Sequence, residues 1–369
     1  MRMTIPMGFS KHIKGSNMKI ICYRAKCGDA YHIKYEGDSG TTRNIFLDMG
    51  FSKTYSSILK DVLLSLLASS QKIDVLFLSH IHNDHIGGTL SLIKDIQNNV
   101  LPKDCVGCWI YNVPRKYKVD KVVEIEEGEL CGIVTADKVY EHILLNSTDS
   151  VSDIIVGESF LFDGMKVIIL SPDKTKLENL RNKYSNNIPL CRNEMDEISV
   201  ECGSTAKDYS TPLNMFDPTS FSEDCSIENA SSIAALFEYA NKRILWLSDS
   251  VPSVVVESLL KYGYSEINKL YCDIMLLSHH GSSSNNSLEL FKMVEADKYI
   301  ISSNGINKYS LPNKETIARI ISSTRKIPVN IYFNYNDARL IQMFRADNPE
   351  TLKKVVDIHY LKDMEEIEI

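Results

Sequence analysis

Three histidines and an aspartate lie within six residues of the chain, directly after a run of mostly apolar residues. The run is 74–79, DVLFLS, and the polar residues that follow it are His80, His82, Asp84 and His85. A short apolar run of this kind predicts a strand that is buried on both faces. Imidazole and carboxylate groups are ligands for Zn²⁺, Mn²⁺ and iron in proteins. Packing gives no reason for such a cluster at a strand end, so the sequence predicts a metal-binding loop.

The spacing within the cluster fits two metal ions. His80 and His82 are two residues apart, so in an extended segment their side chains point the same way. Asp84 and His85 follow as the loop turns, and they can face a second ion. The sequence therefore predicts that one loop serves two ions.

Strands and helices alternate along most of the chain. Gly87 and Gly88 predict a tight turn into a helix over 89–97, whose N-terminus favours an anion. Further strands are expected at 18–36, 44–50, 108–113, 121–126, 132–136, 232–239, 243–247, 274–277, 298–302 and 330–333, and further helices at 58–66, 252–262, 287–295 and 313–323. The polar stretch 173–228 is expected to form a surface insertion or lid. This alternation predicts a layered α/β or α+β arrangement.

Composition excludes several classes of protein. Apolar residues make up 44% of the chain, which is too high for a disordered protein. No apolar run reaches the roughly 18 residues that a membrane helix needs, and the first 17 residues lack the apolar core of a signal peptide. The nine cysteines are scattered rather than arranged as a dense disulfide framework, so we expect a cytoplasmic protein without a membrane part. A formal charge of −7 argues against a protein that coats DNA.

A family resemblance rests on this motif and on several other segments. HIHNDH matches the HxHxDH signature of the metallo-β-lactamase fold. The other similar segments are 28–30 (GDA), 46–50 (FLDMG), 229–249, 273–282 (DIMLLSHHGS) and 300–312. Together they resemble the soluble nuclease-type domain of ComEC-like competence proteins and its free-standing relatives, over about 18–99 and 229–335.

The resemblance implies a fold and a dinuclear metal centre. The fold is a four-layer αββα sandwich, the metallo-β-lactamase fold, with a large middle insertion. The centre holds two divalent ions, Zn or Mn, with His80 and His82 on the first, Asp84 and His85 on the second, and Asp249 bridging them. A hydroxide between the two ions is then the nucleophile, and Asp84 counts among the catalytic residues as well.

The resemblance also implies roles for residues around the ions. His279 and His280 end a second buried strand, and either can donate a proton to the leaving oxygen or bind a phosphate oxygen. We expect His280 to face the substrate and His279 to lie behind it. Asp48 is expected to orient a ligand, and Asn229 and Ser282 are expected to line the site.

Two departures from the family pattern bear on the metals. A third histidine for the first ion is not apparent, since His142 is the only histidine between residues 86 and 228. Leu311 stands where the relatives place the last histidine of the second ion, and Asn313 lies two residues further on. Leucine cannot bind a metal, so a weak or exchangeable second ion is expected.

Three functions remain open at this point. The leading hypothesis is a metal-dependent phosphodiesterase or nuclease that acts on a phosphodiester or nucleic-acid-like substrate. The first alternative is a hydrolase of a lactone, a thioester or another small ester on the same fold. The second is a degenerate metal-binding module of a multi-protein, defence-type system.

The positions of the ligands predict the domain organisation. Ligands at 80–85, 249 and 279–280 must meet in one cleft, so we expect a single domain over 18–335. An N-terminal extension at 1–17 precedes it, and a strand and helix tail at 336–369 packs on it. The insertion of about 100–228 is the expected contact for protein partners or for a second copy of the chain.

Overall fold

The computed structural model describes residues 18–115, 127–146, 150–151, 153–185, 207–307 and 309–369. The expected N-terminal extension and the expected strand at 121–126 lie outside these residues. No helix in the described part of the chain is long and apolar enough to cross a membrane.

The first sheet contains the strand that precedes the histidine cluster. Its seven strands lie in the order β15-β1-β2-β3-β4-β5-β6. Their bounds are β1 (Lys19–Cys22), β2 (Tyr31–Glu36), β3 (Thr42–Leu47), β4 (Ile73–Leu78), β5 (Val106–Tyr111), β6 (Ser150–Val151) and β15 (Glu366–Glu368). Every residue of β4 is buried, as its apolar run predicts. The four strands from β3 to β6 run parallel, so their carboxyl ends share one edge of the sheet.

The second sheet has eight strands in the order β14-β13-β12-β11-β10-β9-β8-β7. Their bounds are β7 (Ser159–Phe162), β8 (Met165–Ser171), β9 (Ala234–Tyr239), β10 (Lys242–Trp246), β11 (Leu270–Leu276), β12 (Val294–Ile301), β13 (Val329–Phe333) and β14 (Val356–Tyr360). The strands from β10 to β14 run parallel.

Helices and short turns connect the strands. The α-helices are α1 (Ser52–Thr54), α2 (Lys60–Ala68), α3 (Asn83–Gln97), α4 (Glu127–Asn146), α5 (Lys174–Ser185), α6 (Ile227–Ala230), α7 (Pro252–Lys261), α8 (Leu288–Met293), α9 (Lys314–Ser323), α10 (Ala338–Gln342) and α11 (Pro349–Leu352). The π-helical segment is η1 (Tyr55–Leu59), and the 3₁₀ turns are η2 (Lys207–Ser210), η3 (Leu213–Met215) and η4 (Ser278–Gly281).

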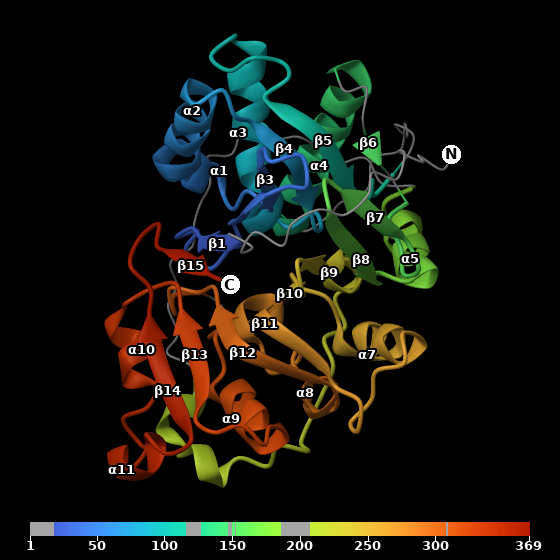
Figure 1. The fold of residues 1–369 in the computed structure, drawn as a ribbon. Coiled ribbons are helices and arrows are strands. Elements are labelled where there is room, and N and C mark those ends of the chain that lie inside the picture. Colours follow the sequence, from blue (N-terminus) through green and yellow to red (C-terminus); the bar gives the residue numbers. More distant parts are fainter. Residues whose placement is uncertain (1–17, 116–126, 147–149, 152, 186–206, 308) are drawn as a thin grey trace.

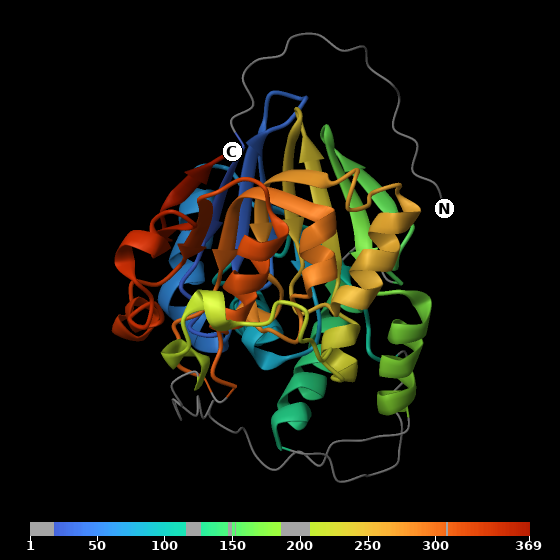
Figure 2. The ribbon, with the colours of Figure 1, turned by 90° about the horizontal axis from the view of Figure 1, so that it is seen from below.

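Three apolar layers hold the sheets and helices together. Phe77 of the first sheet packs edge-on against Trp246 of the second, with ring centroids 6.0 Å apart, in the core between the sheets. A second core lies between the first sheet and α2 to α5, and a third between the second sheet and α7 to α9. Figure 1 shows α7 to α9 below the second sheet, on the side away from the first, and Figure 2 shows these helices from below. The order helix, sheet, sheet, helix confirms the expected four-layer fold class.

The helix after the cluster begins earlier than expected. It starts at Asn83 rather than near Thr89, so Gly87 and Gly88 lie inside α3 and form no turn. A Cβ atom on Gly88 would come within 2.2 Å of the carbonyl oxygen of Met49. These glycines therefore allow α3 to approach the loop after β3 closely, which the sequence pattern alone does not reveal.

The middle of the chain also differs from expectation. Residues 132–136, expected as a strand, belong to α4. Within the polar stretch 173–228, the described part contains α5, two 3₁₀ turns and α6. Ahead of this stretch, within the expected insertion of about 100–228, β5 and β6 belong to the first sheet and β7 and β8 to the second.

Candidate metal centre

The loops that carry the predicted site residues follow neighbouring parallel strands. Asp48 comes directly after β3, and the loop of His80 to His85 comes after β4. In the facing sheet, Asp249 follows β10 and His279 follows β11. Because β3 runs parallel to β4, and β10 to β11, each pair of loops emerges at one edge of its sheet.

The first group of candidate ligands consists of His80, His82 and Asp249. Each offers a ligand atom within 4.8 Å of the other two. His80 Nε2 lies 3.0 Å from His82 Nδ1 and 3.7 Å from Asp249 Oδ2. His80 and Asp249 are almost completely buried, at 2% and 1% exposure.

The second group consists of Asp84, His85 and His280, again within 4.8 Å of one another. Asp84 Oδ2 lies 3.8 Å from His85 Nε2 and 3.4 Å from His280 Nε2. His280, which we expected to face the substrate, is only 3% exposed.

Asp249 lies between the two groups. Its Oδ2 faces His80, while its Oδ1 lies 3.4 Å from His85 Nε2 and 4.0 Å from His280 Nε2. A carboxylate that turns one oxygen to each group has the geometry of a bridging ligand. His279 Nε2 also lies 3.7 Å from Asp249 Oδ2, and the His279 side chain is 18% exposed.

Asp48 fixes the orientation of one histidine in each group. Its Oδ2 lies 2.8 Å from His85 Nδ1 and accepts a hydrogen bond from the Ser79 hydroxyl at 2.6 Å. Because the Ser79 hydroxyl donates to Asp48, it accepts from His80 Nδ1 at 3.0 Å. When neutral, His80 and His85 therefore carry their hydrogen on Nδ1 and turn the lone pair of Nε2 toward the centre.

His280 is held in the same way from the other side. Its Nδ1 lies 3.1 Å from the carbonyl oxygen of Ser302 and 3.3 Å from Asp29 Oδ1, both hydrogen-bond acceptors. Three buried atoms at the centre have no hydrogen-bond partner among the described residues: His85 Nε2, His280 Nε2 and Asp249 Oδ1. Buried polar atoms without partners are costly, and a cation among them would satisfy all three. The residues present thus fit a metal centre.

Burial and charge act in opposite directions on the protonation of these groups. Burial lowers the pKa of His85, but Asp249 and Asp84 outweigh it and raise this pKa well above the usual value. The same holds for His280, where Asp29 and Asp249 outweigh burial and raise the pKa. Burial raises the pKa of Asp249, but His85 and the other nearby histidines bring it well below its usual value. Metal binding must displace the histidine protons, so metal affinity should rise with pH.

His279 and His280 lie in a strained loop, 278–286, here called the histidine loop. Their φ angles are 46° and 54°, in the left-handed region that non-glycine residues rarely adopt. Asn286 Nδ2 holds the loop by donating to the carbonyl oxygens of Ser278 and Ser282, at 2.8 and 2.7 Å. Such backbone strain costs about 1–3 kcal/mol per residue and is typical of functional sites.

Three further predicted residues support this loop or its neighbour. Leu311 is 5% exposed, and its N–H and carbonyl group both bond the Asn307 side chain, at 2.9 and 2.7 Å. Asn313 Oδ1 accepts a hydrogen bond from the Ser283 N–H at 2.8 Å, and Ser282 is buried within the loop. His280, which follows β11, thus lies in the second group, whereas Leu311 is packed in the interior.

Sequence reasoning missed three residues at the centre. Asp29 was singled out only as part of the GDA segment, without a role at the site, yet it contacts His280 and offers an oxygen within 4.8 Å of ligand atoms of His85 and Asp249. Asp224 and Asn285 contact His279, and no sequence signal singles them out.

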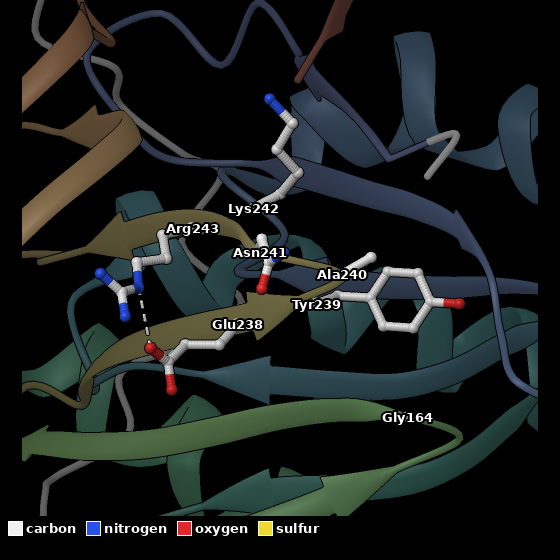
Figure 3. A pocket seen from close by; sticks show the side chains of 7 residues that line it. All are labelled: Gly164, Glu238, Tyr239, Ala240, Asn241, Lys242 and Arg243. Carbon is white, nitrogen blue, oxygen red and sulfur yellow. Dashed lines mark hydrogen bonds and ion pairs between the residues drawn. The ribbon is translucent and has the colours of Figure 1, made fainter. Parts of the chain in front are cut away.

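A separate pocket lies away from these groups. It has a volume of about 380 Å³ and surrounds the hairpin turn between β9 and β10, lined by residues that include Tyr239, Asn241 and Arg243 (Figure 3). β10 begins at Lys242 in this pocket and runs toward Asp249, so the pocket lies at the opposite end of the strand. Its residues take no part in either group.

Comparisons with known proteins agree with this architecture. The family model of the Metallo-beta-lactamase superfamily matches residues 35–162, which include the HIHNDH motif. No curated protein matches the chain.

Several solved structures are similar over most of the chain. CmlA, a diiron β-hydroxylase from Streptomyces venezuelae, has 11% identity and a TM-score of 0.43, over 96% of this chain and 54% of that one. A putative metal-dependent hydrolase from Parabacteroides distasonis has 12% identity and a TM-score of 0.39, over 86% and 97%. A long form of RNase Z from yeast has 13% identity and a TM-score of 0.39, over 97% and 42%.

This chain thus spans about half the length of CmlA and less than half that of the yeast RNase Z. At these identities and TM-scores the similarities carry no argument about activity or substrate. The superfamily match over 35–162, together with two facing sheets covered by helices on their outer faces, shows that the chain has the metallo-β-lactamase fold.

Proposed function

We propose that the protein is a metal-dependent phosphodiesterase or nuclease with two ions that share Asp249. The observation that carries this proposal is the pair of His/Asp groups on the two sides of one buried carboxylate. Sites with two metal ions about 3.5–4 Å apart recur in phosphatases, nucleases and polymerases. Bound ions would polarise a phosphoryl oxygen and lower the pKa of a water molecule to about 7.

The ligands of the two ions follow from the groups. His80, His82 and Asp249 would hold the first ion, and Asp84, His85, His280 and Asp249 the second. Three of these four histidines are oriented through Nδ1. Asp48 orients His85 directly and His80 through the Ser79 hydroxyl. The Ser302 carbonyl oxygen and Asp29 orient His280. Loss of a hydrogen-bond partner that orients a ligating histidine typically changes metal affinity by about 10–100-fold.

His279 is the residue best placed to contact the substrate. It is more exposed than His280, and its Nε2 points to the side of Asp249 that faces the first group. An imidazole there can accept or donate a proton at Nε2 when the bond to the leaving oxygen breaks. The expected roles of the two adjacent histidines are thus exchanged, with His280 as a ligand and His279 toward the substrate.

The test combines metal analysis with hydrolysis of a simple phosphodiester such as bis(p-nitrophenyl) phosphate, single-stranded DNA and RNA. We expect two Zn or Mn ions per chain, and phosphodiester hydrolysis that His82→Ala abolishes. Hydrolysis of only a lactone or thioester by the two-ion protein would favour the alternative enzyme. A protein that binds no ion, or hydrolyses nothing while fully loaded, would contradict the proposal and favour a non-catalytic module.

A further inference from the structure

Asp224 brings a carboxylate to the metal centre from the polar middle segment. It lies between η3 and α6, and its N–H donates to the carbonyl oxygen of Ser284 in the histidine loop at 3.1 Å. Its side chain is 16% exposed, and Oδ2 lies 3.6 Å from His279 Nδ1. The same oxygen accepts hydrogen bonds from Asn229 Nδ2 at 2.6 Å and from Asn285 Nδ2 at 3.1 Å. One carboxylate oxygen therefore determines the orientation of two amide side chains.

Asn285 transmits this orientation to His279. Asn285 Nδ2 donates both to Asp224 and to the carbonyl oxygen of Asp249, at 3.2 Å. Its Oδ1 is then the acceptor that lies 2.9 Å from His279 Nδ1, so this nitrogen carries a hydrogen. The lone pair of a neutral His279 is consequently on Nε2, the nitrogen that faces Asp249.

Asn229 is oriented by the same carboxylate. Asn229 Nδ2 donates to Asp224, so Asn229 Oδ1 points away from that carboxylate. Among the described residues this buried oxygen has no hydrogen-bond partner. A buried acceptor without a partner costs about 1–3 kcal/mol.

The backbone places Asn229 close to the first group. Ser232 N–H bonds the carbonyl oxygen of Asn229 at 2.9 Å, and Ile233 N–H bonds that of Ser79, next to His80, at 3.0 Å. Within the described part of the chain, the first group contains three His or Asp ligands, whereas Zn²⁺ takes at least four. An amide oxygen is also a ligand that suits Mn²⁺.

We propose that Asp224 is a positioning residue for the first metal ion. By binding Asn229 Nδ2 it presents Asn229 Oδ1 to this ion as a ligand. Through Asn285 it also keeps His279 Nε2 directed toward Asp249. The proposal rests on the proposed function only in that the first group binds an ion. The end of the middle segment then has a defined task, since it completes a metal site that two facing sheets leave short of a ligand.

The test is a chelator-competition titration that resolves the affinities of the two ions, with Zn and then Mn as the probe. Asp224 accepts hydrogen bonds at both oxygens, from the Ser226 N–H at Oδ1 and from the two amides at Oδ2, and Asp224→Asn replaces one of these acceptors by an NH₂ group and removes the charge. We expect one ion to bind about 10–100-fold more weakly in this variant and the other to be unchanged. Asp217→Asn is the matched control, because Asp217 is an exposed acid of the same segment whose carboxylate hydrogen-bonds the nearby Thr219. It should leave both affinities unchanged.

Two variants of Asn229 separate a ligand from a merely structural amide. Asn229→Leu should weaken the same ion as Asp224→Asn does, while Asn229→Asp keeps an oxygen ligand but loses the donor to Asp224, so it should bind that ion more tightly than Asn229→Leu does. Retention of the second ion shows that each variant is folded. Unchanged affinities in Asp224→Asn and Asn229→Leu, or an Asn229→Asp variant that binds as weakly as Asn229→Leu, would overturn the proposal. Absence of hydrolysis with normal titrations would count against the proposed function alone.

Discussion

The two groups of the metal centre take their supporting residues from different parts of the chain. The second group, Asp84, His85 and His280, is supported by Asp48 and Asp29, which lie in loops that join strands of the first sheet. In our proposal the first group, His80, His82 and Asp249, also depends on Asp224 and Asn229, from the end of the middle segment. The comparison teaches that loops at the ends of the sheet strands alone form the second site, whereas the first site also uses residues from the long segment between β8 and β9.

This comparison reverses an expectation from the sequence. Leu311 predicts a weak second ion, because it replaces a histidine of the related proteins. In the structure His280 lies beside Asp84 and His85, and its Nδ1 faces the carbonyl oxygen of Ser302 and the carboxylate of Asp29. We therefore expect the second ion to be held well, and the first to be the more sensitive to change in the middle segment.

The largest effect is expected from Asp249→Asn, which removes the negative charge that both groups share and one of the two oxygens that face them. Both ions should bind more weakly, by more than the roughly 10–100-fold expected when a residue that only orients a ligand is lost, and hydrolysis should be lost. Metal content after gel filtration measures this directly. Asp273→Asn, which alters a carboxylate that bonds Lys242 and Arg243 along the same sheet, is the control and should retain both ions. An Asp249→Asn variant with both ions bound normally would break the comparison, since the groups would then share nothing.

A smaller and one-sided effect is expected from His280→Ala, which should release the second ion and leave the first. Leu311→Met, a change of similar volume in a buried position, should leave both ions bound. Equilibrium dialysis with Mn distinguishes one ion per chain from two. Loss of the second ion from Leu311→Met but not from His280→Ala would contradict the assignment.

Asp48→Asn should weaken both sites unequally. Asp48 contacts His85 directly but reaches His80 only through the Ser79 hydroxyl. We expect a loss of about 10–100-fold in affinity for the second ion and a smaller loss for the first, measured by chelator competition. Equal losses at both sites would show that Asp48 acts on the fold rather than on individual ligands.

The smallest effect on the metal centre is expected from a buried histidine that lies outside it. Burial lowers the pKa of His32 to about 4, and its Nε2 has the neutral partner Asn44 rather than an acid. The unfolded chain therefore binds more protons between about pH 6.5 and 4, so this residue destabilises the fold as the pH falls through that range. The loss is of the order of 3 kcal/mol. Urea unfolding in the presence of chelator should show a weaker pH dependence for His32→Gln than for the wild type.

The sequence predicted the parts of this protein that local pattern determines. The apolar run before His80 and the strands that end near Asp249 and His279 are where periodicity places them, and the two-sheet fold class is confirmed. The HxHxDH motif brings four site residues together within one loop, so no knowledge of the tertiary structure was needed to group them.

The rest depends on contacts between distant segments. The proposed exchange of roles between His279 and His280 rests on two left-handed residues in the histidine loop, which no sequence pattern predicts. Asp224 lies in a stretch whose composition indicates only a polar surface, and its role depends on contacts with Asn229 and Asn285. Gly88 likewise indicated a turn, because its close approach to Met49 exists only in the folded protein.

The most direct test of the central claim is a crystal structure of the metal-loaded protein, with anomalous diffraction measured at the absorption edge of the bound metal. Our account predicts two peaks on opposite sides of Asp249, the second bound by Asp84, His85 and His280 and not contacted by Leu311. A single peak, or a second ion that His280 does not bind, would contradict it.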